Sequence, residues 1–171
     1  YSADSIISNN EIADLPYSGI SVGWGWGNEG VMLNPSFSEQ IAPDPSYDTN
    51  IPKYIPITYT ANNQINSNWV HHTMQTLKDG AAIYTISGQL RPSSISANLI
   101  ENVGPNETCK YSDGSYEGAM GINAYLGYAG IYHDNGSIYW NDSQNIIRNF
   151  CGYWMVLQGQ PLPTQMQSSY V

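Results

Sequence analysis

The chain has 171 residues, enough to bury a full hydrophobic core, and its length indicates a single domain. Five Lys and Arg against fourteen Asp and Glu give a formal net charge of -9, which argues against nucleic acid and anionic membrane surfaces as partners, because both are bound largely through positive charge. Charged residues make up only 11% of the chain, so uncharged polar residues must cover its surface, as in exported proteins. No apolar run approaches the length of a membrane span, so we expect no membrane insertion.

The chain opens with a mixed polar segment, residues 1–16, in which aliphatic residues are scattered. This pattern is compatible with a short helix, a linker or a strand exchanged with a neighbouring molecule. We therefore expect the main domain to span residues 17–157, with residues 158–171 as a peripheral tail that holds two prolines.

A glycine-spaced stretch follows, and it matches two enzyme fingerprints. Gly19 to Gly23 spells the GxSxG of a nucleophile elbow, and Gly25 to Gly30 spells the GxGxxG of a dinucleotide site. Both fingerprints need a helix directly afterwards, and more glycines and then a proline follow instead. A strand is the better prediction, with Trp24 and Trp26 on one face and glycines on the other. The two indoles form either an aromatic platform for a ligand or part of the core.

Prolines recur among Ser, Asp and Asn in residues 34–56. Proline removes a backbone donor, so this span should be extended loop or sheet edge, and its length makes it a candidate binding loop. Asp44 and Tyr47 are the binding residues expected there.

Five segments between residues 69 and 142 show strand patterns. Residues 81–90 alternate apolar and polar side chains, and residues 95–103 predict the next strand, whereas residues 69–77 fit either a strand or a short helix. Asn135-Gly136 lies between residues 128–134 and 137–142, which predicts a hairpin with a type I′ turn.

Residues 146–157 are apolar on both faces and predict one long central strand. Turn signals recur about every ten residues with hardly any helix, and we find no internal repeat. The expected fold is therefore an all-β, antiparallel β-sandwich or jelly roll.

The only two cysteines, Cys109 and Cys151, predict a single disulfide in an exported chain. Closing that loop would stabilise the fold by roughly 4 kcal/mol in the chain-entropy model. Three sequons mark candidate glycosylation sites at Asn106, Asn135 and Asn141.

No metal or other cofactor is expected. The three histidines lie far from the cysteines in sequence, and adjacent His71 and His72 should point to opposite faces of a strand, so they cannot easily share an ion. Calcium is a weaker alternative. Its candidate ligands are acidic and amide side chains in loops without calcium-loop spacing, namely Asp134, Asn135 and Asp142, or Asp44 and Asp48.

Glycoside hydrolysis needs two facing carboxylates. The acidic residues considered for that role all fall in predicted loops beside Pro, Gly or Asn, where they usually cap turns: Asp44, Asp48, Asp113, Glu117, Asp134 and Asp142. We therefore expect no catalytic residues and no enzyme.

Several short motifs between residues 79 and 140 resemble the receptor-binding tip domains of phage tail fibres. They are Asp79-Gly80, the run from Tyr84 to Gly88, Leu90-Arg91-Pro92, and the aliphatic segments on either side of Asn135-Gly136. Gln89-Leu90 replaces the Gly-Tyr that precedes Arg-Pro in those domains. The resemblance implies a trimeric β-sandwich that binds cell-surface glycan without chemistry.

The composition points in the same direction, since 14 Tyr and 5 Trp against 2 Phe resemble the make-up of antibody paratopes. We expect an extracellular recognition domain, either a phage tip or an adhesin-like lectin, that binds a saccharide or a cell-surface receptor and forms a homo-oligomer. The expected binding residues are the aromatic, acidic and amide side chains Trp24, Trp26, Asp44, Tyr47, Tyr132, Asn135 and Trp140. The alternative is a structural subunit of an extracellular filament or virion that assembles by strand addition.

Overall fold

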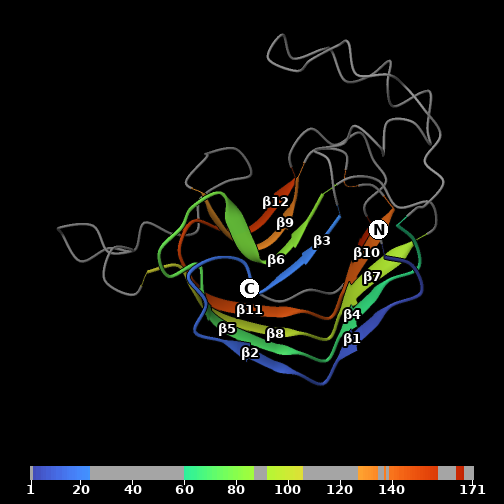
Figure 1. Cartoon of the computed structure of the whole chain (residues 1–171), viewed down its shortest axis with the longest axis horizontal. Coiled ribbons are helices and arrows are strands. Elements are labelled where there is room, and N and C mark those ends of the chain that lie inside the picture. Colours follow the sequence, from blue (N-terminus) through green and yellow to red (C-terminus); the bar gives the residue numbers. More distant parts are fainter. Residues whose placement is uncertain are drawn as a thin grey trace, which may run out of the picture.

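The computed structural model describes residues 2–23, 60–86, 92–105, 127–134, 137 and 139–157, together with the backbone of residues 165–167. The regular structure of these residues is entirely β-strand (Figure 1). The strands are β1 (Ile6–Ser8), β2 (Glu11–Ala13), β3 (Ile20–Val22), β4 (Gln64–Asn66), β5 (Trp69–Thr73), β6 (Gly80–Thr85), β7 (Ser93–Ser96), β8 (Leu99–Val103), β9 (Tyr128–His133), β10 (Trp140–Ser143), β11 (Ile146–Phe150), β12 (Tyr153–Leu157) and β13 (Gln165–Gln167). The described part contains no helix that could span a membrane.

The strands form three parallel sheets, each of which takes every third strand of the chain. The sheet orders are β1-β4-β7-β10-β13, β11-β8-β5-β2 and β12-β9-β6-β3. Three successive strands therefore complete one coil, and the next coil stacks on it, as Figure 1 shows. The architecture is a parallel β-helix, a solenoid in which each coil pairs with its neighbours in the stack.

The antiparallel sandwich expected from the sequence is wrong. Every strand pairing in the described residues is parallel. The predicted hairpin is also wrong, because β9 pairs with β6 and β12 while β10 pairs with β7 and β13 in another sheet. Alternation of apolar and polar residues identifies a strand but not the direction or identity of its partner.

Two of the predicted strands each divide at a corner between sheets. Residues 146–157 form β11 and β12, with the corner at Cys151 and Gly152. Gly152 has a φ of 75°, and a Cβ there would run into the Tyr128 carbonyl oxygen, so glycine is required. Residues 95–103 belong to β7 and β8, with the corner at Ala97 and Asn98. Residues 69–77 begin with β5, a strand and not a helix.

An asparagine occupies the same corner of each of the four described coils, at Asn10, Asn68, Asn98 and Asn145. The residue before it has a left-handed backbone each time, with φ of 58°, 56°, 54° and 57° at Asn9, Ser67, Ala97 and Gln144. Each asparagine side chain from the second coil onward accepts the backbone N–H of the asparagine below it, at 3.0 to 3.1 Å. These four side chains form the asparagine ladder.

The ladder is an internal repeat, which corrects our failure to find one in the sequence. The asparagines are separated by 58, 30 and 47 residues, so no fixed period exists for a sequence comparison to detect. The residues around each asparagine nevertheless match, because an aliphatic residue follows it by two positions in every coil: Ile12, Val70, Ile100 and Ile147.

Aliphatic side chains from all three sheets fill the interior of the solenoid. Each sheet contributes an inward row that stacks from coil to coil, for example Ile65 on Ile95, and Ile83 on Ile131. Ile65, Ile83, Ile95 and Ile131 are completely buried. Each Å² of apolar surface that these rows bury stabilises the fold by roughly 25 cal/mol, and this burial is the main stabilising contribution to the solenoid.

The two chain ends also take part in the sheets. In residues 1–16, for which we expected a helix, a linker or an exchanged strand, β1 and β2 pair with β4 and β5 of the same chain. In residues 158–171, expected to be a peripheral tail, the backbone of β13 pairs with β10.

Candidate functional site

Most of the binding residues expected from the sequence lie outside the described residues, namely Trp24, Trp26, Asp44, Tyr47 and Asn135. The two described ones, Tyr132 and Trp140, are buried, at 3% and 0% exposure. Trp140 belongs to the core cluster, so it presents no surface to a ligand. The candidate glycosylation residue Asn141 is exposed, and Asn106 and Asn135 lie outside the described residues.

The serine of the GxSxG sequence, Ser21, lies in the middle of β3 and is exposed. The chain then continues to Gly23, which has a φ of 124°. A nucleophile elbow needs the serine at a turn between a strand and a helix, so the fingerprint has no structural basis here.

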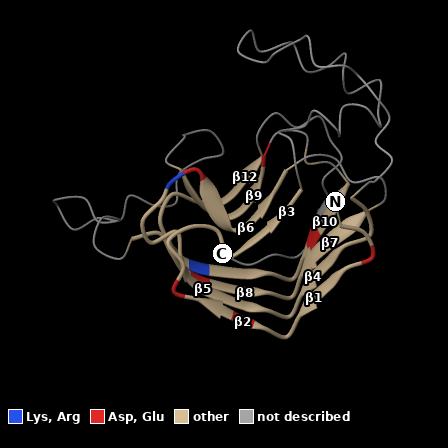
Figure 2. Cartoon of the chain, viewed as in Figure 1, with Lys and Arg blue, Asp and Glu red and all other residues tan. Residues whose placement is uncertain are grey.

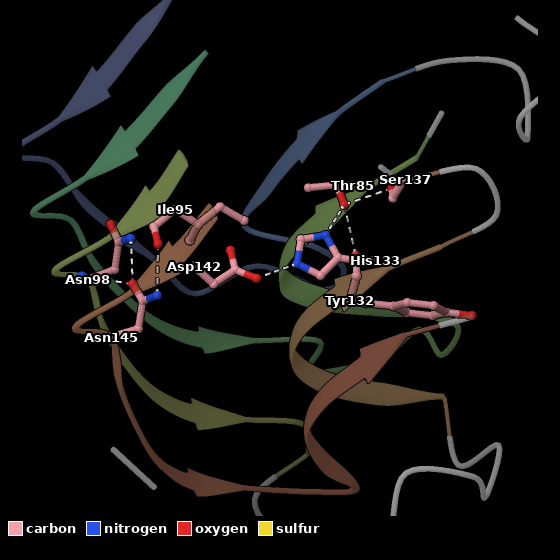
Figure 3. A network of polar contacts seen from close by, with 8 residues as sticks. All are labelled: Thr85, Ile95, Asn98, Tyr132, His133, Ser137, Asp142 and Asn145. Atoms are coloured by element: carbon pink, nitrogen blue, oxygen red, sulfur yellow. Dashed lines mark hydrogen bonds and ion pairs between the residues drawn. The ribbon is translucent and has the colours of Figure 1, made fainter. Parts of the chain in front are cut away.

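A polar network lies inside the solenoid, among the aliphatic rows (Figure 3). His133 Nε2 is 2.7 Å from Asp142 Oδ2, and both side chains are completely buried. His133 Nδ1 is 2.7 Å from the Thr85 hydroxyl, which is 2.9 Å from the hydroxyl of Ser137. Thr85 and His133 are direct partners in neighbouring strands, which explains their contact.

Asp142 occupies the inward row that holds Ile7, Ile65 and Ile95 in the other coils. A carboxylate in that row is costly unless it is paired, and His133 supplies the partner. The Thr85 hydroxyl, the His133 imidazole and the Asp142 carboxylate follow one another as the groups of a hydrolytic triad do. All three side chains are buried, so a substrate cannot reach them. The network therefore holds the solenoid together and is not the candidate site.

The outer surface of the sheet β2-β5-β8-β11, which we call the outer β5 face, carries a different cluster. Its outward residues form two rows across the strands. The first row contains Glu11, Trp69, Leu99 and Ile146, and the second contains Ala13, His71, Glu101 and Arg148. Trp69 and Ile146 are among the most exposed large apolar residues described, at 43% and 46%.

Glu101 is at the centre of this cluster. Arg148 donates to its Oε1 atom from Nε at 2.6 Å and from Nη2 at 2.5 Å, and the Trp69 indole N–H donates to its Oε2 atom at 2.8 Å. In Figure 2 a basic segment of β11 lies beside an acidic one, in agreement with the register of Arg148 and Glu101. These charge-assisted bonds hold the Glu101 carboxylate in one orientation.

Trp69 is held in place by a second contact, because its ring stacks on the His71 imidazole with centroids 4.1 Å apart. His71 Nε2 lies 3.0 Å from Oε1 of Glu11, whose side chain is 61% exposed. The cluster thus combines an exposed, fixed indole with two carboxylates, and its members come from four different coils.

His71 and His72 do not point apart, which corrects the expectation that they occupy opposite faces. Their Nδ1 atoms are 2.7 Å apart. The cause is the backbone of His72, which has a φ of 48° and turns its side chain out of strand alternation.

Tyr84 and Asp134 form a separate pair on the third sheet, where the Tyr84 hydroxyl donates to Asp134 Oδ2. Burial, followed by this bond to a carboxylate, raises the pKa of Tyr84 well above its usual range. Tyr84 therefore remains a protonated donor at any physiological pH.

Four residues of this cluster were not predicted from the sequence to be site residues: Glu11, Trp69, Glu101 and Arg148. The asparagine ladder was the signal that could have found them. Glu11 and Trp69 directly follow a ladder asparagine, and Glu101 and Arg148 follow one by three positions. Once the asparagines are aligned, these residues fall into two neighbouring outward rows.

Within the described part of the chain no cysteine is free. Cys109 lies outside it, so the pairing of Cys109 with Cys151 stays a prediction. The same part contains no group of three or more His, Cys, Asp or Glu side chains arranged to hold a metal ion. The suggested calcium ligand Asp142 is already paired with His133.

Comparison with known proteins yields no matching family model and no matching curated protein. One solved structure, of a glycoside hydrolase, matches with a TM-score of 0.59 at 20% sequence identity. The match covers 99% of this chain but only 21% of that chain, so the chain spans about a fifth of the larger protein. At this identity the likeness shows the fold alone.

The match contradicts the reasoning behind the expectation that the chain is not an enzyme, because a segment of a glycoside hydrolase has the same fold. That expectation rested on carboxylates confined to loops of an antiparallel sandwich. The fold is instead shared with a glycoside hydrolase, and Glu11 and Glu101 lie on strands.

Proposed function

We propose that the chain acts on glycans and binds a saccharide on the outer β5 face. The exposed ring of Trp69, fixed between Glu101 and His71, carries this proposal. An indole offers a large rigid surface on which the apolar face of a sugar ring can stack. The Glu11 carboxylate and the Arg148 guanidinium, whose side chains are 61% and 60% exposed, are partners for sugar hydroxyls.

The apolar row extends the platform across the coils, since Leu99 and Ile146 follow Trp69 in register. Neighbouring parallel strands are about 4.8 Å apart, so successive coils present side chains at an interval comparable to one sugar ring. An extended saccharide that lies across the strands would contact one coil after another.

Glycoside hydrolysis is the reaction that this surface fits. It requires two carboxyl groups, placed roughly 6.5 to 9.5 Å apart when water attacks the sugar directly. Glu11 belongs to β2 and Glu101 to β8, and these two strands flank β5. The strands β2 and β8 are therefore about 9 to 10 Å apart, and the long side chains of the two glutamates can bring their carboxyl groups nearer to one another. Three donated hydrogen bonds hold the Glu101 carboxylate in one orientation, and the exposed Glu11 carboxyl group is the second member of the proposed pair.

The fold shared with a glycoside hydrolase supports this proposal. The low content of charged residues and the many Tyr and Trp support an extracellular site of action. No observation favours an adhesin or a filament subunit.

A glycan array followed by a hydrolysis assay on the bound glycans tests the proposal. Trp69→Ala should abolish binding, whereas Leu77→Ala removes a comparably exposed apolar side chain elsewhere and should leave binding unchanged. Glu11→Gln and Glu101→Gln should retain binding and lose hydrolysis. Circular dichroism must show that all four variants are folded. If the wild-type chain binds no glycan, or if folded Trp69→Ala binds as well as wild type, the proposal is wrong.

A further inference from the structure

The Trp69 indole offers a ligand only part of its chemistry, because its polar edge is already occupied. Its N–H donates to Glu101 Oε2 at 2.8 Å, and one face of its ring stacks on the His71 imidazole. Trp69 is nevertheless 43% exposed. The surface left for a ligand is therefore the opposite face of the ring, whose π electrons attract a cation.

Glu11 is the direct strand partner of Trp69 in the same outward row. Its side chain is 61% exposed, and His71 Nε2 contacts one of its carboxylate oxygens, Oε1, at 3.0 Å. The other oxygen, Oε2, makes no hydrogen bond within the described residues. Both carboxylate oxygens of Glu101, in contrast, already accept hydrogen bonds from Arg148 and Trp69. An open carboxylate oxygen thus adjoins an open aromatic face.

The described basic side chains do not oppose a cation at this place. Of the two that the structure describes, Arg148 is bonded to Glu101, and Lys78 lies over the Tyr128 ring of the third sheet, 5.8 Å from its centroid. The chain as a whole has a formal charge of -9, so its electrostatic field attracts cations and repels polyanions.

An aromatic face beside a carboxylate recognises an ammonium group. We propose that the saccharide of the outer β5 face is an amino sugar, whose protonated amine lies between Glu11 Oε2 and the Trp69 ring. Leu99 and Ile146 follow Trp69 along the row and offer apolar surface, so the neighbouring sugars of an oligomer need carry no charge. This inference rests on the proposed function, because it names the substrate class of the same surface.

Three oligosaccharides of equal length and linkage test the proposal, because they differ at a single carbon of each sugar. Oligomers of glucosamine carry an ammonium group there, those of N-acetylglucosamine an acetamide and those of glucose a hydroxyl. Calorimetry at a pH that keeps the amine protonated measures the three dissociation constants. The glucosamine oligomer should bind about 3- to 30-fold more tightly than the other two, from one cation–π contact and one exposed ion pair. This preference should shrink as salt is added.

Two variants and one control locate the preference. Glu11→Gln should weaken binding of the glucosamine oligomer to the level of the neutral oligomers, whose own binding through Trp69 stays unchanged. Trp69→Ala should abolish binding of all three. Asp79→Asn removes the same charge from an exposed carboxylate that precedes β6, and it should leave all three affinities unchanged. Circular dichroism must show that the variants are folded.

The outcomes separate this proposal from the proposed function. If the three oligomers bind equally and Trp69→Ala removes their binding, the amino-sugar preference is wrong and saccharide binding on the outer β5 face stands. The preference is also overturned if Glu11→Gln and Asp79→Asn weaken binding of the glucosamine oligomer equally, or if the chain binds another glycan through Trp69 but not this oligomer. A chain that binds no glycan at all overturns both.

Discussion

The asparagine ladder should contribute unequally to stability along the solenoid, and Asn98→Ala tests this. The Asn98 side chain is 1% exposed and makes four hydrogen bonds. It donates to the Ile65 carbonyl at 3.0 Å and to Asn145 Oδ1 at 2.9 Å, and it accepts from the backbone N–H and the side-chain amide of Asn68, both at 3.0 Å. All four are lost in the variant, and buried partner groups remain without their bonds.

At about 1 kcal/mol for each bond, with a further cost for the groups left unpaired, Asn98→Ala should lower the free energy of unfolding by about 3 to 5 kcal/mol. Asn10 at the end of the ladder is exposed, and its side chain makes only two bonds, to Ser8 and Asn68. Asn10→Ala should therefore cost only about 0.5 to 1.5 kcal/mol, because water replaces the lost partners.

Urea denaturation of both variants, compared at equal m-values, measures the difference. The backbone of Asn98 does not have positive φ, so alanine introduces no strain there. Equal destabilisation by the two substitutions would refute the claim that the buried side-chain bonds of the ladder stabilise the coils.

Three further predictions concern the interior, a corner and the third sheet. Asp142→Ala leaves His133 Nε2 buried without its partner, so it should lower the free energy of unfolding measured in urea by about 1 to 3 kcal/mol. An unchanged free energy of unfolding would contradict a stabilising role for the His133–Asp142 pair. Gly152→Ala should cost more than about 1 kcal/mol in urea denaturation, because φ is 75° and a Cβ there meets the Tyr128 carbonyl oxygen; an unchanged free energy of unfolding would contradict the requirement for glycine at this corner. Folding raises the pKa of Tyr84, so the contribution of the Tyr84 hydroxyl to stability is complete below about pH 10 and is lost as the pH rises further. Over that alkaline range the free energy of unfolding of Tyr84→Phe, measured by urea denaturation, should fall less than that of the wild type.

The sequence predicted strands more successfully than it predicted how they are arranged. Residues 81–90 were correctly expected to contain a strand, and β6 begins at Gly80. The corner at Ala97 was missed, because an alanine with a φ of 54° has no turn signal in its residue type. Parallel pairing was missed as well, since a partner 58, 30 or 47 residues away leaves no local trace.

The candidate site could not be predicted for the same reason. Glu11, Trp69, Glu101 and Arg148 are far apart in the chain, and only the register of four coils makes them neighbours. His71 and His72 were noticed, but regular strand geometry placed them on opposite faces. The positive φ of His72 recurs inside β8 and β11 at the matching register, at Asn102 and Asn149, and a histidine gives no sequence signal for it.

The unequal separation of the ladder asparagines has a consequence for how such a chain can change. Each coil is aligned with the next by its corner asparagine and its strand pairing, and neither depends on how many residues connect one coil to the next. Residues can therefore be gained or lost between coils while the outward rows of the outer β5 face stay in register. A surface assembled from several coils can in this way keep the same arrangement of side chains while insertions and deletions change the length of the protein.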